Sequence, residues 1–166
     1  KNLFNMRKII LTLSIMFFIT TNVLAAGSSS SSSSSETKSN YEQAVKLIKS
    51  AKKNEKKGKK DKAQSNYEKA LKLLLKSNKK KPNKADTLNY LGFTTRKLGD
   101  YETGEKYYLQ GLAIEPNHIG INEYLGELYV ATNRIDLAKE RLNVLSSCNC
   151  KEYSQLKEVI DGTRKS

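Results

Sequence analysis

The sequence contains no tryptophan, two cysteines, two prolines and a single histidine in 166 residues. One histidine excludes a histidine-rich metal centre, and two thiols fall short of the ligand set that a structural zinc site takes. The sequence also has no glycine-rich phosphate loop and no paired carboxylates in a catalytic motif. We therefore expect no catalytic residues, no cofactor and no metal, and the chain is not predicted to be an enzyme.

Acidic residues are scarce, because 17 aspartates and glutamates stand against 30 lysines and arginines, giving a formal net charge of +13. The excess lies in residues 36–84, which hold 17 lysines and 5 acidic residues, whereas residues 85–166 hold 10 basic and 12 acidic residues. This asymmetry favours attraction to an anionic partner. A compositional bias towards lysine, asparagine, isoleucine and serine is the alternative interpretation.

The longest apolar run lies near the N-terminus and is typical of a secretory signal. Basic residues at 7–8 precede an apolar stretch at residues 9–24, and small residues follow at Ala25. The stretch is shorter than the roughly 20 residues of a membrane span, so cleavage after Ala25 is favoured over an uncleaved anchor. We expect residues 1–25 to be a signal peptide, with residues 1–5 upstream of the natural start. The protein would then be periplasmic or secreted from a bacterium.

Residues 26–38 hold eight consecutive serines after a glycine. Such a segment has no capacity to form a core and predicts a flexible linker. Helical periodicity begins after it, with Ser39 or Asn40 as the expected N-cap. A turn is predicted over residues 52–60, and a second helix over residues 61–79.

A helical hairpin is predicted in residues 85–118. Leu88, Leu91 and Leu98 lie three and seven residues apart, which places them on one helix face. A Gly-Asp pair then interrupts the pattern, and a second helix follows until a proline ends it. The apolar stripe of this second helix comprises Tyr101, Tyr108, Leu109, Leu112 and Ala113.

The hairpin pattern recurs along the chain. The Leu-Gly pair at residues 91–92 returns 34 residues later at 125–126, with an Asn-Arg turn at residues 133–134 in place of Gly-Asp. An earlier copy has its turn glycine, Gly58, 41 residues before Gly99. The seven extra residues are about two helical turns, so they predict a longer second helix in the first copy.

This pattern resembles the tetratricopeptide repeat (TPR), a 34-residue helical hairpin with a Leu-Gly pair, a small residue in its second helix and a closing proline. The resemblance implies an all-α fold, a right-handed superhelical stack of three TPR-like helix-turn-helix repeats plus a C-terminal capping helix. The repeats would span residues 39–84, 85–118 and 119–152, followed by a capping helix and tail over residues 153–166.

Small and aromatic residues at fixed repeat positions predict how the helices pack. Gly92 and Gly126 are expected where two helices cross closely, because a larger side chain would push the backbones apart. Tyr67, Tyr108 and Leu142 are expected to fill the space towards the next repeat. We assign these residues structural roles.

In the TPR family the concave surface, formed by the first helix of each repeat, is the binding surface. The residues that point away from the core stripe there are Lys52, Lys56, Asn89, Phe93, Arg96, Lys97, Glu123 and Glu127. The groove is expected to be basic at one end and acidic at the other, with Asn89 and Phe93 between. The predicted function is an exported scaffold or adaptor that binds an unidentified protein or peptide, in assembly or maintenance of the cell envelope.

An alternative hypothesis assigns binding to the lysine-rich first repeat. This repeat would bind a polyanion, such as anionic lipid, cell-wall polymer or nucleic acid, without recognising a specific nucleic acid. Its basic surface comprises Lys72, Lys76, Lys79, Lys80 and Lys81. The sequence leaves the oligomeric state open.

Cys148 and Cys150 form the one reactive-looking motif. In an oxidising compartment we expect a local disulfide that ties the last repeat to its cap. An intermolecular or redox-active pair and a metal site are alternatives, and thiol-redox or metal handling would be a third function. A Cys-x-Cys motif before a short leucine-containing helix also resembles the ends of small exported bacterial TPR proteins. His118 lies 32 residues before Cys150, close to one repeat length, but is expected to be a solvent-exposed loop residue.

Overall fold

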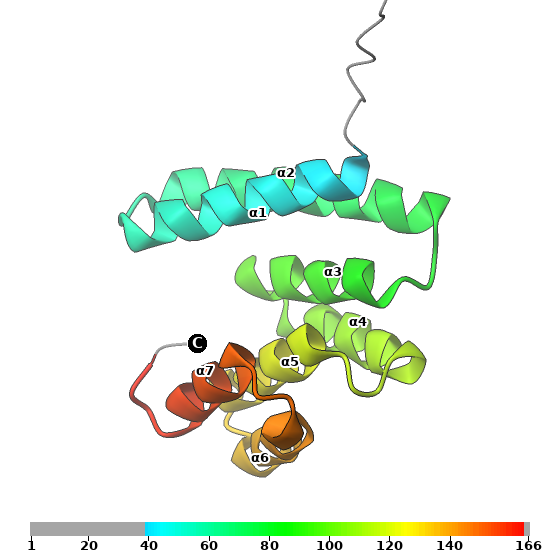
Figure 1. The fold of residues 1–166 in the computed structure, drawn as a ribbon. Coiled ribbons are helices and arrows are strands. Elements are labelled where there is room, and N and C mark those ends of the chain that lie inside the picture. The colour runs from blue at the N-terminus through cyan, green and yellow to red at the C-terminus, as the bar shows by residue number, and fades with distance from the viewer. Residues whose placement is uncertain (1–38, 165–166) are drawn as a thin grey trace, which may run out of the picture. The chain divides into compact units, whose positions relative to one another are not determined.

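The computed structural model describes residues 39–164, which are helical and contain no strand (Figure 1). Residues 1–38, which carry the predicted signal peptide and linker, lie outside the described residues. The described elements are α1 (Asn40–Lys56), α2 (Lys60–Lys80), α3 (Ala85–Lys97), α4 (Tyr101–Ile114), α5 (Ile119–Ala131), α6 (Ile135–Val144), the 3-10 turn η1 (Leu145–Ser147) and α7 (Lys151–Ile160). None of these helices is long and apolar enough to cross a membrane.

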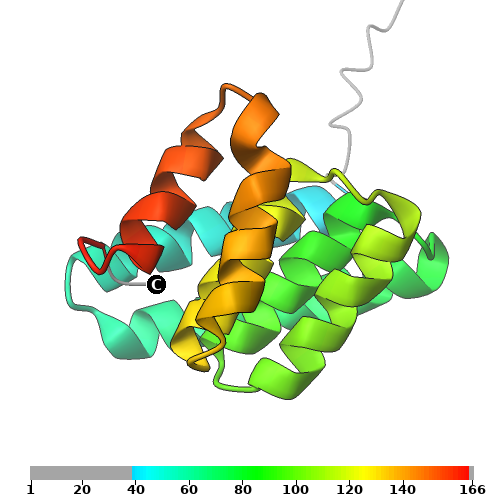
Figure 2. The same cartoon turned by 90° about the horizontal axis from the view of Figure 1, so that it is seen from below.

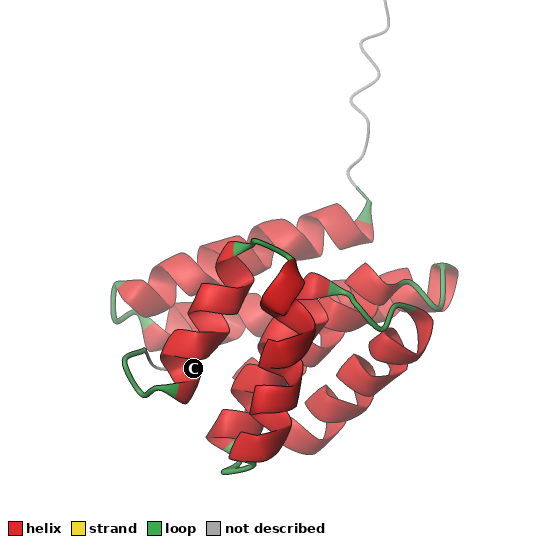
Figure 3. Ribbon diagram, turned by 60° about the horizontal axis from the view of Figure 1, so that its bottom comes forward, coloured by secondary structure: helices red, strands yellow, loops and turns green. Residues whose placement is uncertain are grey.

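Consecutive helices form three stacked hairpins. α1 packs on α2, α3 on α4 and α5 on α6, and the hairpins meet where α2 packs on α3 and α4 on α5. α7 packs on α5 and α6 at the end of the stack. Figures 1 and 2 show this order from cyan to red, and Figure 3 shows the short loops between the helices. The predicted all-α stack of three helix-turn-helix hairpins plus a C-terminal helix is confirmed.

α1 begins at the predicted cap and ends later than predicted. The Ser39 hydroxyl accepts a hydrogen bond from the Glu42 N–H (3.2 Å), and the Glu42 carboxylate accepts one from the Ser39 N–H (2.8 Å). This capping box satisfies donors that a helix start leaves without intrahelical partners. The helix then continues to Lys56, so the predicted turn at residues 52–60 is wrong in its first half. Lysine and glutamate favour helix, and no helix breaker occurs before Gly58.

The turns within the hairpins use left-handed backbone conformations. Gly58, Gly99 and Asn133 have φ values of 68°, 97° and 58°. Glycine adopts this conformation without steric cost, and asparagine tolerates it better than most residues. Asn133 therefore replaces the turn glycine, as predicted. α2 has 21 residues and α4 has 14, which confirms the longer second helix of the first hairpin.

Glycines lie at the close crossings of α3 with α4 inside the second hairpin and of α5 with α7. A Cβ atom on Gly92 would lie 2.5 Å from a ring carbon of Tyr108, and one on Gly126 would lie 2.5 Å from a methyl carbon of Leu156. A Cβ atom on Gly104 would lie 3.1 Å from the Gly92 carbonyl oxygen, so α3 and α4 approach backbone to backbone. The predicted close crossings at Gly92 and Gly126 are confirmed.

The buried aromatic positions follow the repeat, except in the third hairpin. Tyr67 and Tyr108 are 1% and 0% exposed. Leu142, predicted to fill the equivalent space, is only half-buried. Leu145 is fully buried instead, because the chain tightens into η1 after α6 and turns this residue inwards. The sequence prediction was therefore wrong for Leu142.

The apolar stripe predicted for α4 is wrong at three positions, since Ala113 is exposed as well as Tyr101 and Leu109. Tyr101 and Leu109 are 42% and 48% exposed. The buried face of α4 comprises Gly104, Tyr108 and Gly111, which are spaced by four and three residues. Leu109 lies about 100° around the helix from Tyr108, so the 3.6-residue period turns it towards solvent.

Candidate peptide-binding groove

Residues from α1, α3 and α5 line a cavity of about 390 Å³, which we call the central cavity. Gln155 of α7 and Arg164 beyond it complete the lining, together with Glu55 and Tyr124. The first helix of every hairpin thus contributes side chains to one depression. The predicted groove residues that line it are Lys52, Lys56, Phe93, Arg96, Lys97 and Glu127.

Phe93 forms the aromatic floor of the central cavity. It is 3% exposed, so the expectation that it points away from the core is wrong. Its ring centroid lies 5.9 Å from that of Tyr67 and 4.8 Å from that of Tyr124, in edge and tilted arrangements. The longer α1 and α2 place residues opposite α3 that cover Phe93, and the ring joins the three hairpins.

Lys52 lies above this floor. Its Nζ lies 4.4 Å from the Phe93 ring centroid and 4.9 Å from that of Tyr124, and it donates a hydrogen bond to the Tyr124 hydroxyl (2.9 Å). Burial lowers the pKa of the ammonium, while the carboxylates of Glu123 and Glu127 oppose this effect. The cation–π contacts and the hydroxyl fix the ammonium at the cavity instead of leaving it mobile in solvent.

Arg96 is a buried cation with an unused donor. Its side chain is 5% exposed, and its Nη2 lies 2.7 Å from a Glu127 oxygen. Its Nε is buried and has no hydrogen-bond partner among the described residues. A buried donor without an acceptor costs about 1–3 kcal/mol, so an incoming acceptor at Nε would recover part of that cost.

A second ion pair joins the first and second hairpins. Lys97 Nζ lies 3.0 Å from a Glu55 oxygen, and the other Glu55 oxygen accepts a hydrogen bond from the Tyr67 hydroxyl (2.9 Å). Charges of both signs are therefore interleaved and paired across the hairpins. The predicted groove with a basic and an acidic end is wrong, because neighbouring first helices bring opposite charges opposite one another.

Glu123 and Asn89 are buried behind the central cavity and do not line it. Burial first, then the neighbouring Glu127 carboxylate, raises the pKa of Glu123 to about 7. The Gln155 amide donates to Glu123 (2.7 Å) in the orientation that satisfies both amide atoms. Asn89 is 6% exposed beside Gly120, and its Oδ1 has no partner among the described residues. Both were wrongly predicted to face an open groove.

Sequence reasoning missed Glu55, Tyr124, Gln155 and Arg164. Glu55 was placed in a turn because the end of α1 was set too early, although it lies one helical turn after Lys52. Tyr124 was given no role. The approach of Gln155 and Arg164 depends on how α7 folds back on α5, and no local signal in the sequence specifies that packing.

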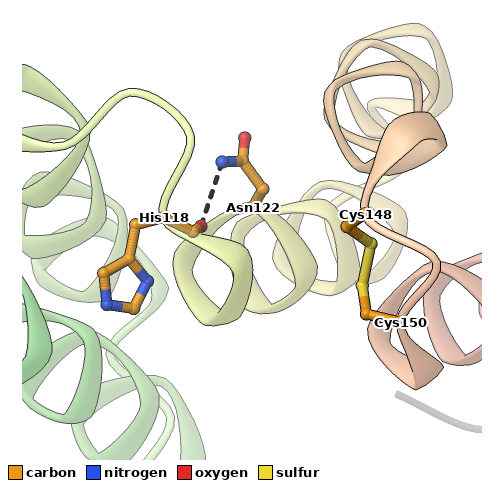
Figure 4. Close-up of a disulfide and its surroundings, with 4 residues drawn as sticks. All are labelled: His118, Asn122, Cys148 and Cys150. Carbon is orange, nitrogen blue, oxygen red and sulfur yellow. Dashed lines mark hydrogen bonds between the residues drawn. A yellow bond between two sulfur atoms is a disulfide. The ribbon is translucent and has the colours of Figure 1, made fainter.

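Cys148 and Cys150 form a disulfide with a Cα–Cα distance of 5.1 Å. It lies between η1 and α7, so it ties the end of the third hairpin to the capping helix, as predicted. Figure 4 shows the disulfide beyond α5 and the imidazole of His118 turned away from it.

His118 is the N-cap of α5 and is not a solvent-exposed loop residue as expected. Its Nδ1 accepts a hydrogen bond from the Ile121 N–H (3.1 Å), and its Nε2 lies 3.1 Å from an Asp86 oxygen. The side chain is 12% exposed, since it packs against the start of α3. Asn122 donates to the His118 carbonyl oxygen (3.0 Å; Figure 4), which extends the cap.

The predicted basic surface lies on α2 and the residue after it, away from the lining of the central cavity. Lys72, Lys76, Lys79, Lys80 and Lys81 are all exposed. Lys80 and Lys81 also line a separate cavity near the starts of α1 and α3.

Comparisons with known proteins agree with this fold. No curated protein matches the chain significantly. Among solved structures, the first TPR of Spaghetti (RPAP3) bound to HSP90 peptide SRMEEVD resembles this chain with a TM-score of 0.52 and 17% sequence identity, covering 75% of this chain and 96% of that chain. The likeness shows a TPR-like helical repeat fold. A family model matches residues 28–135, and the chain therefore belongs to the family described as "Protein of unknown function, DUF612".

Proposed function

We propose that this protein is a non-enzymatic interaction scaffold that binds a short acidic peptide segment of a partner protein in the central cavity. The observation that carries the proposal is the convergence of three hairpins on one depression that holds a buried, incompletely satisfied Arg96. A volume of about 390 Å³ is in the range of small ligand pockets and accommodates a few side chains.

Charge favours an acidic ligand. The lining contains the cations Lys52, Lys56, Arg96, Lys97 and Arg164 and only two carboxylates, Glu55 and Glu127. Both carboxylates are already engaged in ion pairs. The exposed Lys56 ammonium lines the cavity and forms no ion pair within residues 39–164, so it is open to a peptide carboxylate.

The rigid part of the cavity suits an extended segment. The Phe93 and Tyr124 rings and the fixed Lys52 ammonium provide a preorganised floor, which lowers the entropy lost on binding. The TPR domain of Spaghetti (RPAP3), which has the same type of fold, was solved with the acidic HSP90 peptide SRMEEVD. This neighbour supports peptide binding as a use of the fold.

We further propose that the scaffold acts outside the cytoplasm, in the bacterial cell envelope. The support is the sequence of residues 6–25, with its basic start, apolar stretch and small residues at Ala25. Expression of the full chain in a bacterium, followed by N-terminal sequencing of the envelope fraction, is expected to give a mature chain that begins at Ala26. Retention of Met6 on the mature protein would contradict export by cleavage.

Peptide binding is tested with a displayed library of random seven-residue peptides and the full chain. Acidic peptides are expected to be enriched. The best peptide is then titrated against Lys56→Glu and Lys57→Glu, which change the same charge at adjacent exposed positions, although only Lys56 lines the central cavity. Lys56→Glu is expected to weaken binding at least tenfold and Lys57→Glu by less than threefold. Equal losses, or no enrichment of acidic peptides, would contradict the proposal.

A further inference from the structure

The lysines of the first hairpin differ from most later basic residues in that they form no ion pairs among the described residues. Residues 39–84 contain sixteen lysines and four acidic residues, and none of these lysines forms an ion pair within residues 39–164. In residues 85–164, seven of the nine lysines and arginines form such pairs. The unpaired positive charge is therefore concentrated at one end of the stack.

Part of this charge lies along α2 and the residue after it, in what we call the α2 lysine row: Lys72, Lys76, Lys79, Lys80 and Lys81. Lys72, Lys76 and Lys79 follow one another at spacings of four and three residues, so they lie on one helix face with Cβ atoms about 5–6 Å apart. All three are exposed, and they lie opposite the buried face that contains Ala70 and Leu74. Like charges at this spacing repel one another, and an anion that spans them would relieve this repulsion.

The row leads to a second cavity of about 550 Å³, formed where the end of α2 meets the starts of α1 and α3. Lys80, Lys81 and Lys84 line this terminal cavity, with Tyr41 as its aromatic wall. The Tyr41 ring is held edge-on against Tyr90, with centroids 5.9 Å apart. Three cations thus converge on a concave site beside a fixed ring.

One carboxylate lines the terminal cavity, and it is already engaged. Asp86 contributes an oxygen that lies 3.1 Å from His118 Nε2. Within residues 39–164, the three lysines therefore form no ion pair. A concave surface lined by one sign of charge concentrates anions of opposite sign.

We propose that the α2 lysine row (Lys72, Lys76, Lys79, Lys80 and Lys81) and the terminal cavity form a binding site for a linear, phosphate-bearing polymer. The row provides successive cations for successive phosphates, and the cavity receives one unit of the chain against the Tyr41 ring. A flat bilayer cannot enter a concave site of this size, whereas a flexible chain can. Recognition along the row is independent of sequence, because exposed lysines contact phosphates and carry no information about the bases.

This site is separate from the proposed peptide site. The two cavities share no lining residue. Binding of a polymer to the α2 lysine row thus depends neither on Arg96 nor on the Phe93 floor, and each site is open to its own test.

The probe is a fluorescein-labelled twenty-residue oligothymidylate, measured by fluorescence anisotropy with the full chain. If five lysines contact phosphates, the slope of log K against log salt is about −3.5, since each contact on a single strand contributes roughly −0.7. The Kd is then expected to rise on the order of 100-fold between 50 and 200 mM salt.

Two variants with equal loss of charge locate the site. Changing the five lysines of the α2 lysine row to Gln is expected to raise the Kd at low salt at least 30-fold. The matched control changes five other exposed lysines of the first hairpin to Gln: Lys49, Lys53, Lys57, Lys59 and Lys60. The control is expected to stay within fivefold of the wild type, and circular dichroism of both variants verifies the fold.

Two competitors identify the source of the phosphate. Displacement of the oligothymidylate by inorganic polyphosphate shows that the phosphate chain is sufficient, and failure of displacement assigns the site to nucleic acid strands. Both results support the proposal. Equal losses in the two lysine variants, absence of binding at low salt, or tighter binding to anionic phospholipid vesicles than to the oligothymidylate would overturn it.

Discussion

Replacing Gly92 with Ala tests the close crossing of α3 and α4 within the second hairpin. The added Cβ atom would lie 2.5, 2.6 and 2.9 Å from three ring carbons of Tyr108, which is 0% exposed and has no free space to turn into. Overpacking of this kind costs typically about 1–3 kcal/mol, while alanine gains about 1 kcal/mol over glycine within a helix. Three contacts under 3 Å place the overpacking cost at the upper end of this range, so we expect a net loss of about 2 kcal/mol in the free energy of unfolding. Gly92→Leu should lose more than about 2 kcal/mol.

Urea denaturation followed by circular dichroism measures this loss, and Gly111→Ala is the matched control. Gly111 is also buried in a helix, but its new Cβ atom would have one contact under 3 Å, with the terminal methyl carbon of the flexible Ile121 side chain, whereas a Cβ atom on Gly92 would meet three atoms of a rigid ring. The control is expected to be neutral or stabilised by up to about 1 kcal/mol. Combining Gly92→Ala with Tyr108→Leu should give a loss smaller than the sum of the single losses, because the smaller side chain relieves the clash. A Gly92→Ala protein as stable as the wild type would refute the close crossing.

Three further predictions concern stability. Because the pKa of Glu123 is about 7 in the folded state and 4.5 unfolded, the folded state binds the extra proton between these values. The wild type should therefore lose about 2–3 kcal/mol in the free energy of unfolding relative to Glu123→Gln as the pH rises from 4.5 to 7.5, measured by urea titrations. A difference in stability between the two proteins that stays constant with pH would contradict the assignment. Asp100→Ala should cost about 1 kcal/mol, because Asp100 accepts the Thr103 N–H at 3.0 Å as a helix cap. Reduction of Cys148–Cys150 should lower the melting temperature only slightly, since so short a loop adds little stability, and a collapse of the fold would refute this.

The features that could be predicted from sequence are those set by neighbours within a few residues. Ser39 caps α1 because a serine and a glutamate three residues later accept hydrogen bonds from each other's backbone N–H groups. Asn133 marks a turn because few other residues tolerate its positive φ. The 34-residue spacing of the Leu-Gly pairs likewise locates α3 and α5, since each pair identifies the same position in a hairpin. These rules determine where helices begin, end and cross.

The candidate site was predicted less well because it depends on pairing between hairpins. Arg96 and Glu127 are 31 residues apart, and Lys52 and Tyr124 are 72 residues apart. Their contacts depend on the rotation of one hairpin on the next, which the helical period of a single hairpin does not contain. Phe93 was assigned to an open face for the same reason. Sequence reasoning named both Arg96 and Glu127 as groove residues, but the helical pattern did not reveal that they form an ion pair with each other.

This pairing divides the molecule into two kinds of charged surface with different expected responses to salt. In the central cavity, the Arg96–Glu127 pair is about 5% exposed and poorly screened, so salt should weaken binding there only moderately, through exposed contacts such as Lys56. On α2, Lys72 and Lys76 are exposed and unpaired within the described residues, so binding there should weaken steeply as salt rises. Ion pairs with Glu55 and Glu127 thus offset part of the positive charge of the central cavity, whereas the α2 lysine row has no ion-pair partner within residues 39–164. If the lysines reflected a compositional excess alone, binding would still weaken steeply with salt, but the two five-lysine variants would lose affinity equally.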